Sequence, residues 1–178
     1  MAGGAFQRQN PGNQNYLFLL SKSYGSYGFG FLENRILQFE GKDPARQAVT
    51  IERAKLFYKR GRVFGQSWIA RKNNGRRKAI DHGLGPLREE LADAGQGDVE
   101  SIFWTAFSWG NYINLTKDEV RSVSDLAIVE AMMGRVMELD PNFFFGGPHL
   151  FYGIYYASRP PMLGGNPKLA REHFENAS

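Results

Sequence analysis

Hydrophobic residues recur along this chain at steps of three and four positions, the period of an amphipathic helix. The first helix is predicted from about Gln14 toward Leu37, where Tyr16, Leu19, Leu20, Tyr24 and Tyr27 follow this spacing. The same spacing predicts further helices over 44–71, 77–92, 99–115, 116–139, 144–158 and 167–178. No segment between turn signals alternates with a period of two, so the pattern predicts an all-α protein.

Polar residues and prolines mark the starts of several predicted helices. Asp43-Pro44 and Asn166-Pro167 each place a capping side chain before a proline that suits the first turn. Asp98 is predicted to cap the helix that follows it, and Thr116 with Glu119 forms a capping box. A turn is predicted around residues 73–75, and a break is predicted within residues 83–86.

Three glycines interrupt the first predicted helix and lower its intrinsic stability. Because no strand precedes them, they do not read as a phosphate-binding loop. Their expected benefit is the close approach of a neighbouring helix. These residues are Gly25, Gly28 and Gly30.

The spacing also predicts how the helices are grouped. His149, Tyr152, Gly153 and Tyr156, followed by Ala170, Phe174 and Ala177, fit the two helices of a tetratricopeptide repeat with a lengthened joint. Weaker copies begin near Trp104 and near Leu20. We therefore expect helical hairpins stacked as degenerate tetratricopeptide-like repeats in an α-α superhelix. The alternative is an irregular helical bundle whose core spacing resembles the repeat.

Length and composition fit one helical domain. Residues 1–13 are predicted to be a flexible segment, and residues 14–178 a single helical-repeat domain. Aromatic residues make up 14% of the chain and need burial in a core, a groove or an interface. There is no cysteine, no apolar run near the roughly 20 residues of a membrane helix, and no pattern typical of a signal peptide.

The titratable residues do not predict an active site. His82, His149 and His173 are too scattered in sequence for a metal site, and no catalytic residue or cofactor site is predicted. His149 lies at a predicted helix start, where it either faces a groove or makes structural hydrogen bonds. An enzyme is therefore the last of the functions considered.

Basic residues are concentrated between Arg53 and Arg88, although the formal net charge is only +4. A nucleic-acid-binding surface here is one hypothesis, and it would weaken steeply with salt. No aromatic residue interleaves the run from Arg71 to Lys78, so a solvated corner between helices is the simpler interpretation, and nucleic acid is not an expected partner.

Aromatic residues are the candidate contacts for a partner or ligand. Trp104 and Trp109 are separated by about 140° around a helix, so one is expected in the core and the other in a groove or subunit contact. A helix buried on most sides is the alternative. The candidate groove aromatics are Tyr24, Tyr27, Tyr112, Tyr152 and Tyr156.

Several short motifs, taken together, resemble the T component of tripartite ATP-independent periplasmic (TRAP) transporters, the TatT family. Phe103-Trp104-Thr105-Ala106 and Glu138-Leu139-Asp140-Pro141 carry part of the resemblance. The strongest part is Gly146-Gly147-Pro148-His149, followed by Arg159-Pro160 and by Leu163-Gly164-Gly165-Asn166-Pro167. The candidate partner or ligand surface consists of Trp104, Trp109, Gly146, Gly147, Pro148, His149, Arg159, Pro160, Gly164 and Gly165.

The resemblance implies a non-enzymatic, exported protein that is commonly lipid-anchored. It implies docking to the substrate-binding P component, a possible homotrimer, and a path for a small hydrophobic or organic-acid ligand. The chain carries no lipoprotein signal or anchoring cysteine, and it stops just inside what looks like the last paired helix, so we expect it to be truncated at both ends relative to the family. The alternative function is a general tetratricopeptide-like scaffold for protein–protein interaction.

Overall fold

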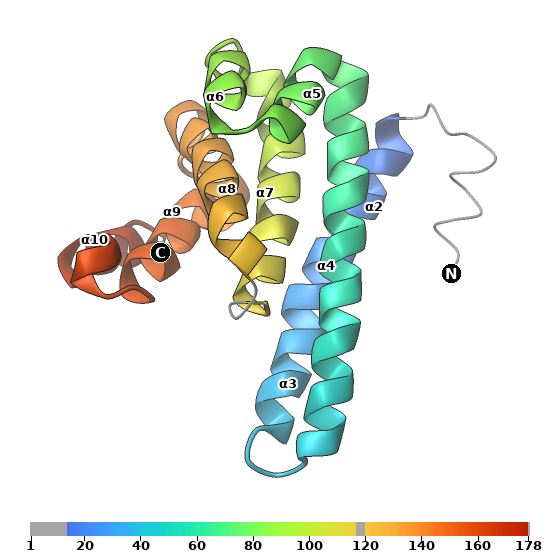
Figure 1. Ribbon diagram of the computed structural model, residues 1–178, viewed down its shortest axis with the longest axis vertical. Coiled ribbons are helices and arrows are strands. Elements are labelled where there is room, and N and C mark those ends of the chain that lie inside the picture. Colours follow the sequence, from blue (N-terminus) through green and yellow to red (C-terminus); the bar gives the residue numbers. More distant parts are fainter. Residues whose placement is uncertain (1–13, 117–119, 178) are drawn as a thin grey trace.

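The computed structural model describes residues 14–116 and 120–177 of the chain, and every regular element in these ranges is a helix. The all-α prediction is therefore confirmed. Figure 1 shows a long hairpin of helices standing beside a cluster of shorter ones. Within the described ranges, no helix is long and apolar enough to pass through a membrane.

The long hairpin is formed by the first half of the chain. Helix α2 (Gln14–Tyr27) continues through a π-helical turn, η1 (Gly28–Glu33), into α3 (Asn34–Phe39). The chain then returns along them in α4 (Pro44–Lys72), which packs against α2, α3 and, on another side, α7. The lower part of this hairpin extends beyond the other helices (Figure 1).

The second half contributes shorter helices, several of which pack against their neighbours in the chain. The short pair α5 (Asn74–His82) and α6 (Leu84–Ala92) precedes a 3-10 turn, η2 (Gln96–Asp98). Helices α7 (Val99–Asn114) and α8 (Val120–Leu139) pack together, and α9 (Phe143–Ala157) packs against α8. The turn η3 (Pro161–Leu163) leads to α10 (Pro167–Asn176), which packs against α9.

This grouping is compatible with the predicted repeats. The pairs α2/α4, α7/α8 and α9/α10 occupy the three stretches in which the repeat spacing was found, and α5 and α6 lie between the first two. The tetratricopeptide-like assignment itself stays a prediction.

The predicted starts of α4 and α10 are confirmed at atomic detail. Asp43 Oδ1 accepts a hydrogen bond from the backbone N–H of Arg46 at 3.0 Å, and Asn166 Oδ1 accepts from the N–H groups of Lys168 and Leu169 at 3.1 Å. Each cap precedes a proline in the first turn, as the sequence indicates.

Two other predicted boundaries need correction. Asn73 caps α5 by accepting from the N–H of Arg76 at 3.0 Å, so α5 begins at Asn74 and not at Arg77. Asp98 makes no side-chain cap on α7, because its carboxylate accepts from the N–H of Gly95 at 3.2 Å and pairs with Arg76 at 3.2 Å. The predicted break is confirmed at Gly83, where φ is +104°. The predicted capping box of Thr116 includes residues 117–119, which lie outside the described residues.

Helix α7 lies at the centre of the core. Six of its apolar residues are no more than 2% exposed, and they pack with apolar side chains of α4, α6 and α8. These residues are Val99, Ile102, Phe103, Trp104, Ala106 and Trp109. The helix is therefore buried on most sides, which was the alternative interpretation of its two tryptophans.

Small residues bring α2, α4 and α7 into close contact. A Cβ atom added to Gly61 would lie 3.0 Å from Ser108 Cβ, and one added to Gly65 would lie 3.0 Å from Thr105 Cα. Gly25 faces Ser108 and Phe107, and Gly28 faces the Tyr58 ring, so the expected close approach is found at both. It is not found at Gly30, which has no neighbour within 4 Å.

Candidate functional site

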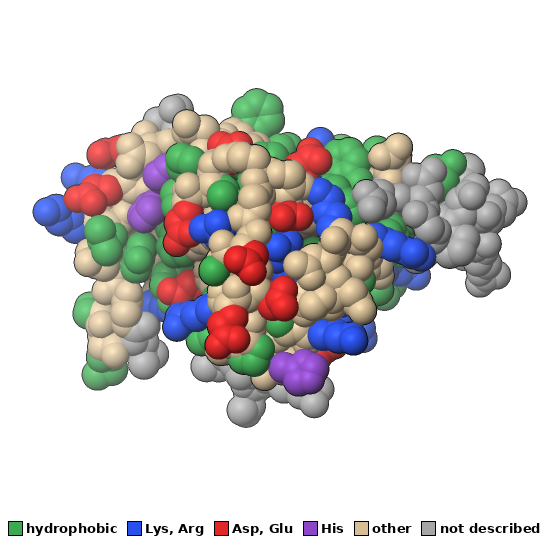
Figure 2. Space-filling view, turned by 90° about the horizontal axis from the view of Figure 1, so that it is seen from above, with side chains coloured by type: hydrophobic (Ala, Val, Ile, Leu, Met, Phe, Trp, Pro, Cys, Tyr) green, Lys and Arg blue, Asp and Glu red, His purple; other side chains and the backbone are tan. Residues whose placement is uncertain are grey.

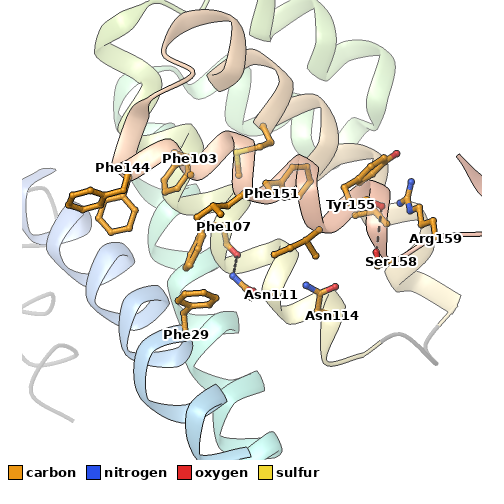
Figure 3. A pocket seen from close by; sticks show the side chains of 17 residues that line it. Phe29, Phe103, Phe107, Asn111, Asn114, Phe144, Phe151, Tyr155, Ser158 and Arg159 are labelled. Carbon is orange, nitrogen blue, oxygen red and sulfur yellow. Dashed lines mark hydrogen bonds between the residues drawn. The ribbon is translucent and has the colours of Figure 1, made fainter. Parts of the chain in front are cut away.

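The candidate site lies between one face of α7 and one face of α9. On α7, Phe103 and Phe107 are followed one and two turns later by Gly110, Asn111 and Asn114, so these residues share a face. The facing residues of α9 are spaced in the same way. They are Gly147, Leu150, Phe151, Ile154 and Tyr155. Between the two faces is a pocket of about 330 Å³ (Figure 3).

Residues of two further elements complete the pocket wall. Leu126 and Met133 of α8 and Phe29 of η1 line the pocket together with the α7 and α9 residues. Phe29 meets the Phe107 ring edge-on, with the ring centroids 5.6 Å apart. Because Phe29 belongs to the π-helical turn, that irregular turn contributes directly to the pocket wall.

An unusual backbone turn shapes the start of α9. Phe144, Phe145 and Gly146 take positive φ values of 48°, 57° and 67°, so the right-handed helix begins only after them. The sequence predicted a right-handed helix from Phe144, and this is wrong for residues 144–146, whose backbone is left-handed. A left-handed phenylalanine costs about 1–2 kcal/mol. The packing of Phe144 on Trp104, with ring centroids 4.6 Å apart, offsets part of this cost.

The left-handed turn places two aromatic rings at one end of the pocket. Phe144 also lies 5.9 Å from the Phe103 ring and forms part of the wall. Phe145 lines the same end but is 85% exposed. The side chains at this end of the pocket are therefore mainly aromatic, and Phe145 is open to solvent.

Polar groups collect at the other end of the pocket (Figure 3). The Arg159 guanidinium lies 3.6 Å above the Tyr155 ring. Ser158 follows the last turn of α9, and Asn111 and Asn114 reach the pocket from α7. The Asn111 side chain donates to the Phe107 carbonyl at 2.9 Å. Its amide oxygen remains available as an acceptor for a ligand.

Arg159 is the one charged residue among the described residues that line this pocket. Burial raises the pKa of the neighbouring Tyr155, and a hydrogen bond to Glu130 and its negative charge raise it further, whereas Arg159 lowers it. The net direction of the pKa change is upward, so the phenol remains neutral at pH 7. The pocket therefore combines apolar walls with a single fixed positive charge at one end.

The predicted partner surface is divided among several places in the structure. Gly147 and Arg159 line the pocket. Trp104 and Trp109 are only 1% and 2% exposed, which corrects their assignment to a groove or subunit surface. Of the five candidate groove tyrosines, none is among the residues that line the pocket. Tyr24 and Tyr27 lie on the α2–α4 hairpin instead, where their rings contact Phe57.

Trp109 has a structural role that its sequence position did not reveal. Its indole Nε1 donates to Asp125 Oδ2 at 3.0 Å, and the Arg62 guanidinium lies 3.3 Å above its ring. Arg62 also pairs with Asp125 at 3.4 Å. The three side chains therefore join α4, α7 and α8.

The motif Gly146-Gly147-Pro148-His149 fixes the start of α9. Gly146 needs its positive φ, and Gly147 lies against Phe103, where a Cβ atom would come within 2.6 Å of the ring. Pro148 is buried in the first right-handed turn. His149 Nδ1 forms a hydrogen bond with His173 Nδ1 at 3.0 Å, which is the structural role considered for this histidine.

The motif from Arg159 to Asn166 fixes the connection between α9 and α10. The Gly165 N–H donates to the Pro160 carbonyl at 3.0 Å, and the Asn166 N–H donates to the Tyr156 carbonyl at 3.0 Å. Gly164 has a φ of +88°, and a Cβ atom at Gly165 would overlap the Arg159 carbonyl. This rigid connection holds Arg159 at the polar end of the pocket.

Several pocket residues were missed by sequence reasoning. These are Phe29, Phe103, Phe107, Phe144, Phe151 and Tyr155. A signal for most of them was present, because aromatic residues at i and i+4 on α7 lie opposite aromatic residues at the same spacing on α9. In both helices the stripe ends in polar residues, which is the pattern of a pocket with an apolar and a polar end.

Across the described ranges, no three metal-ligating side chains (His, Cys, Asp or Glu) come together in a way that could hold an ion. His149 and His173 do meet, but as a pair. The Arg53–Arg88 region also does not form a continuous basic patch. Arg76 is buried against Asp98, Arg62 pairs with Asp125, and acidic and basic side chains are interspersed at the end that α5 and α6 occupy (Figure 2).

Comparison with known proteins agrees with the motifs at the start and end of α9. No curated protein is similar enough to this chain to be matched. A family model described as the TRAP transporter T-component matches residues 4–178, which include every element described above. The chain therefore belongs to the TRAP transporter T-component family.

Proposed function

We propose that this protein is a non-enzymatic accessory component of a TRAP transporter that docks the substrate-binding protein and holds a small apolar organic acid between α7 and α9. Family membership supports the transporter role. The observation that carries the ligand proposal is the aromatic pocket with Arg159 at its polar end.

The size and the lining of the pocket fit a small amphipathic ligand. A volume of about 330 Å³ lies within the range of small-molecule sites, and such sites are mostly apolar with a few orienting polar groups. An apolar tail would displace water from the phenylalanine rings, which is favourable. A carboxylate would meet Arg159, whose planar guanidinium suits paired hydrogen bonds to two oxygens.

The polar groups at the pocket support binding more than catalysis. Ser158 Oγ donates to the Tyr155 carbonyl at 3.5 Å, and among the described lining residues no histidine or carboxylate stands beside it as a base. We accordingly assign the pocket a binding role. A periplasmic location with a lipid anchor, as the family implies, belongs to the same proposal.

A self-associated form is also part of the proposal. Phe145, Leu150 and Ile154 are 85%, 42% and 45% exposed around the pocket, and together they form an apolar rim. Exposed apolar rims of this kind commonly mark contacts with other molecules. A second or third copy of the chain could cover this rim, as in the trimer that the family implies; light scattering after gel filtration measures the mass that decides it.

A general peptide-binding scaffold is less well supported. The candidate aromatic residues for such a peptide groove are Tyr24, Tyr27, Trp104 and Trp109, but the two tryptophans are buried in the core. The tyrosines alone contact Phe57 on the hairpin, and no described pocket combines the four residues.

The ligand proposal can be tested with a simple pair of probes. Decanoate and 1-decanol share an apolar tail, and only decanoate carries a charge at neutral pH. Calorimetric titration is expected to show tighter binding of decanoate. Arg159→Gln should weaken decanoate binding about tenfold, the effect of losing one charge-assisted interaction worth about 1.4 kcal/mol, while leaving decanol unchanged.

A second variant tests whether the ligand enters this pocket. Ile154→Trp places a large ring at the wall and should abolish the binding of both probes. Exposed Leu19 on α2 is absent from the pocket lining, so Leu19→Trp is the matched control and should bind both. Equal binding of decanoate by all variants would remove the ligand proposal.

A further inference from the structure

Helix α4 carries three parallel rows of residues that repeat every seven positions. Seven residues fall about 20° short of two full turns, so each row runs nearly along the helix axis. Val49, Leu56 and Val63 form an apolar row and are 71%, 46% and 50% exposed. Arg46, Arg53 and Arg60 form an exposed arginine row. Phe57 and Phe64 form a half-buried aromatic row.

The arginine row lies between the other two rows. At 100° per residue, it is about 60° from the apolar row and nearly 40° from the aromatic row. Helix α2 widens the aromatic side, because Tyr24 contacts both Phe57 and Phe64, with ring centroids 5.3 and 5.5 Å apart. The three rows together with Tyr24 and Tyr27 are called the hairpin face below.

Two of the three guanidinium groups of the hairpin face lie over its rings. Arg53 Cζ is 5.7 Å from the Phe57 centroid, and Arg60 Cζ is 5.7 Å from the Tyr24 centroid. Arg46 pairs with Asp43 at 3.3 Å. Arg53 and Arg60 make no ion pair with any residue of the described ranges, unlike the buried Arg76. Two oriented positive charges are therefore available to an acidic partner.

One end of the hairpin face is hollowed. A notch of about 370 Å³ lies between α4 and the continuous segment of η1 and α3, with Leu32 and Phe39 on one side and Val49 on the other. Arg35, Arg46 and Arg53 surround it. An apolar side chain from outside would fit among these residues, and its carboxylate neighbours would meet the three arginines.

We propose that the hairpin face binds an acidic amphipathic helix of the transporter's substrate-binding protein. The apolar row extends over 14 residue steps, about 21 Å of helix, which is long enough for a second helix to pack alongside with its apolar residues on this row and its carboxylates beside the arginine row. Tyr, Phe and Arg are also the residue types enriched at the centres of protein interfaces. The proposal rests on the proposed function and identifies the surface by which docking occurs.

The order of the rows disfavours two other occupants. A helix that lies on a bilayer keeps its cations at the edges of an apolar face, where they reach the headgroups. Here the arginines run down the middle, where carboxylates of a protein can meet them. A second copy of the same face would place arginine row against arginine row, which is repulsive.

The experiment measures binding of the full chain to the purified substrate-binding protein by biolayer interferometry at low and high salt. Arg53→Glu with Arg60→Glu is the test variant. Arg88→Glu with Arg171→Glu is the control, since both residues are exposed on α6 and α10 and the net charge changes equally. A second test variant, Leu56→Asn, removes the middle of the apolar row without changing charge.

We expect the test double variant to lose at least about tenfold in affinity and most of its salt dependence. Leu56→Asn should lose several-fold, and the control should bind like the wild type. Decanoate binding should stay unchanged in all of them, because none of these residues lines the α7–α9 pocket. Thermal unfolding of each variant confirms that the fold is retained.

Each other outcome overturns the inference in a recognisable way. If the wild type binds the partner and the test variants bind equally well, docking occurs elsewhere and the proposed function survives. If the wild type does not bind the partner, the docking part of the proposed function fails as well. Binding to phosphatidylglycerol vesicles is measured in parallel by co-sedimentation. If the test variants bind the partner protein like the wild type and lose only their binding to the vesicles, the hairpin face is a membrane contact.

Discussion

The two long sides of α7 are packed in opposite ways. Toward α2 and α4 it presents Thr105 and Ser108, which lie against Gly25, Gly61 and Gly65 of these helices, so the backbones approach closely. Toward α9 it presents Phe103 and Phe107. Gly147 of α9 packs on the Phe103 ring, and beyond this contact the two facing sides leave a pocket of about 330 Å³. One side of α7 is therefore tightly packed on α2 and α4, and it is called the frame below. The other side lines the α7–α9 pocket, and it is called the container.

The difference shows how a small helical protein keeps an apolar pocket without losing its fold. A pocket forfeits the close packing that normally stabilises a core. On the small-residue side no such space remains, and the Ser21 hydroxyl donates to the Gly61 carbonyl at 3.1 Å across the contact. The frame can hold α7 in place while the other side stays open.

Adding bulk to the frame should have the largest effect. Ser108→Leu would push its side chain into the sites beside Gly25 and Gly61, where added Cβ atoms would already meet the Ser108 side chain. We expect a loss of about 3 kcal/mol or more in the free energy of unfolding, measured by urea titration. Ser108→Ala is the control and should be nearly neutral, because the buried hydroxyl has no hydrogen-bond partner among the described residues.

A single methyl group should separate tight from open glycine sites. In Gly65→Ala the new Cβ would lie 3.0 Å from both Thr105 Cα and Ser21 Oγ, so we expect a loss of about 1–3 kcal/mol. Gly30→Ala meets no atom within 4 Å and should instead gain up to about 1 kcal/mol from higher helix propensity. Equal effects in thermal unfolding would contradict the comparison.

Adding bulk to the container should be tolerated. Ile154→Trp fills open space at the pocket wall, so the free energy of unfolding should change by less than about 1 kcal/mol. Urea titration under the conditions used for Ser108→Leu makes the two results comparable. A loss as large as that of Ser108→Leu would show that the pocket side is as tightly packed as the frame.

Acidification should affect the α9–α10 pair before the frame. Burial and the neighbouring His149 lower the pKa of His173, whereas Glu172 acts in the opposite direction. A lowered pKa in the folded state contributes stability above the unfolded value near 6.5, and this contribution is lost as pH falls through the folded value. Hydrogen exchange should therefore show faster opening of α10 at pH 5 than at pH 7.

The control for this effect removes the histidine pair. His173→Phe should keep the ring stacking with Tyr152 and Tyr156, whose centroids lie 5.3 and 5.7 Å from the His173 ring, and should lose the pH dependence. The effect is expected to be the smallest of the four, because His173 is partly exposed to solvent. If α10 still opened faster at pH 5 in His173→Phe, the pH dependence would come from titratable groups other than His173.

Most of the fold could be predicted because the apolar spacing on each helix is regular. The helix starts at Asp43 and Asn166 were also predictable, since their capping chemistry is local. Asp98 was not, because its carboxylate is taken by Arg76, a partner 22 positions away. Local sequence cannot reveal a competing long-range contact of this kind.

The pocket was harder to predict than the fold. Sequence reasoning favoured tryptophans and tyrosines, yet burial placed Trp104 and Trp109 in the core and left phenylalanines along the cavity. The left-handed Phe144 and Phe145 could not be anticipated, because phenylalanine intrinsically avoids positive φ. Gly146 and Gly147 of the family motif do lie beside the pocket, but the sequence could not show which neighbouring residues leave no room for a side chain at these two positions.

Those neighbours give the adjacent glycines Gly146 and Gly147 different freedom to change over evolution. A side chain at Gly147 would meet the Phe103 ring, and a smaller residue at position 103 could restore the space. A side chain at Gly146 would meet the backbone of Ala177, 2.9 Å away, at a φ of +67°. No substitution elsewhere removes a backbone atom. Gly147 can therefore be substituted together with Phe103, whereas Gly146 must remain glycine as long as the Ala177 backbone lies against it.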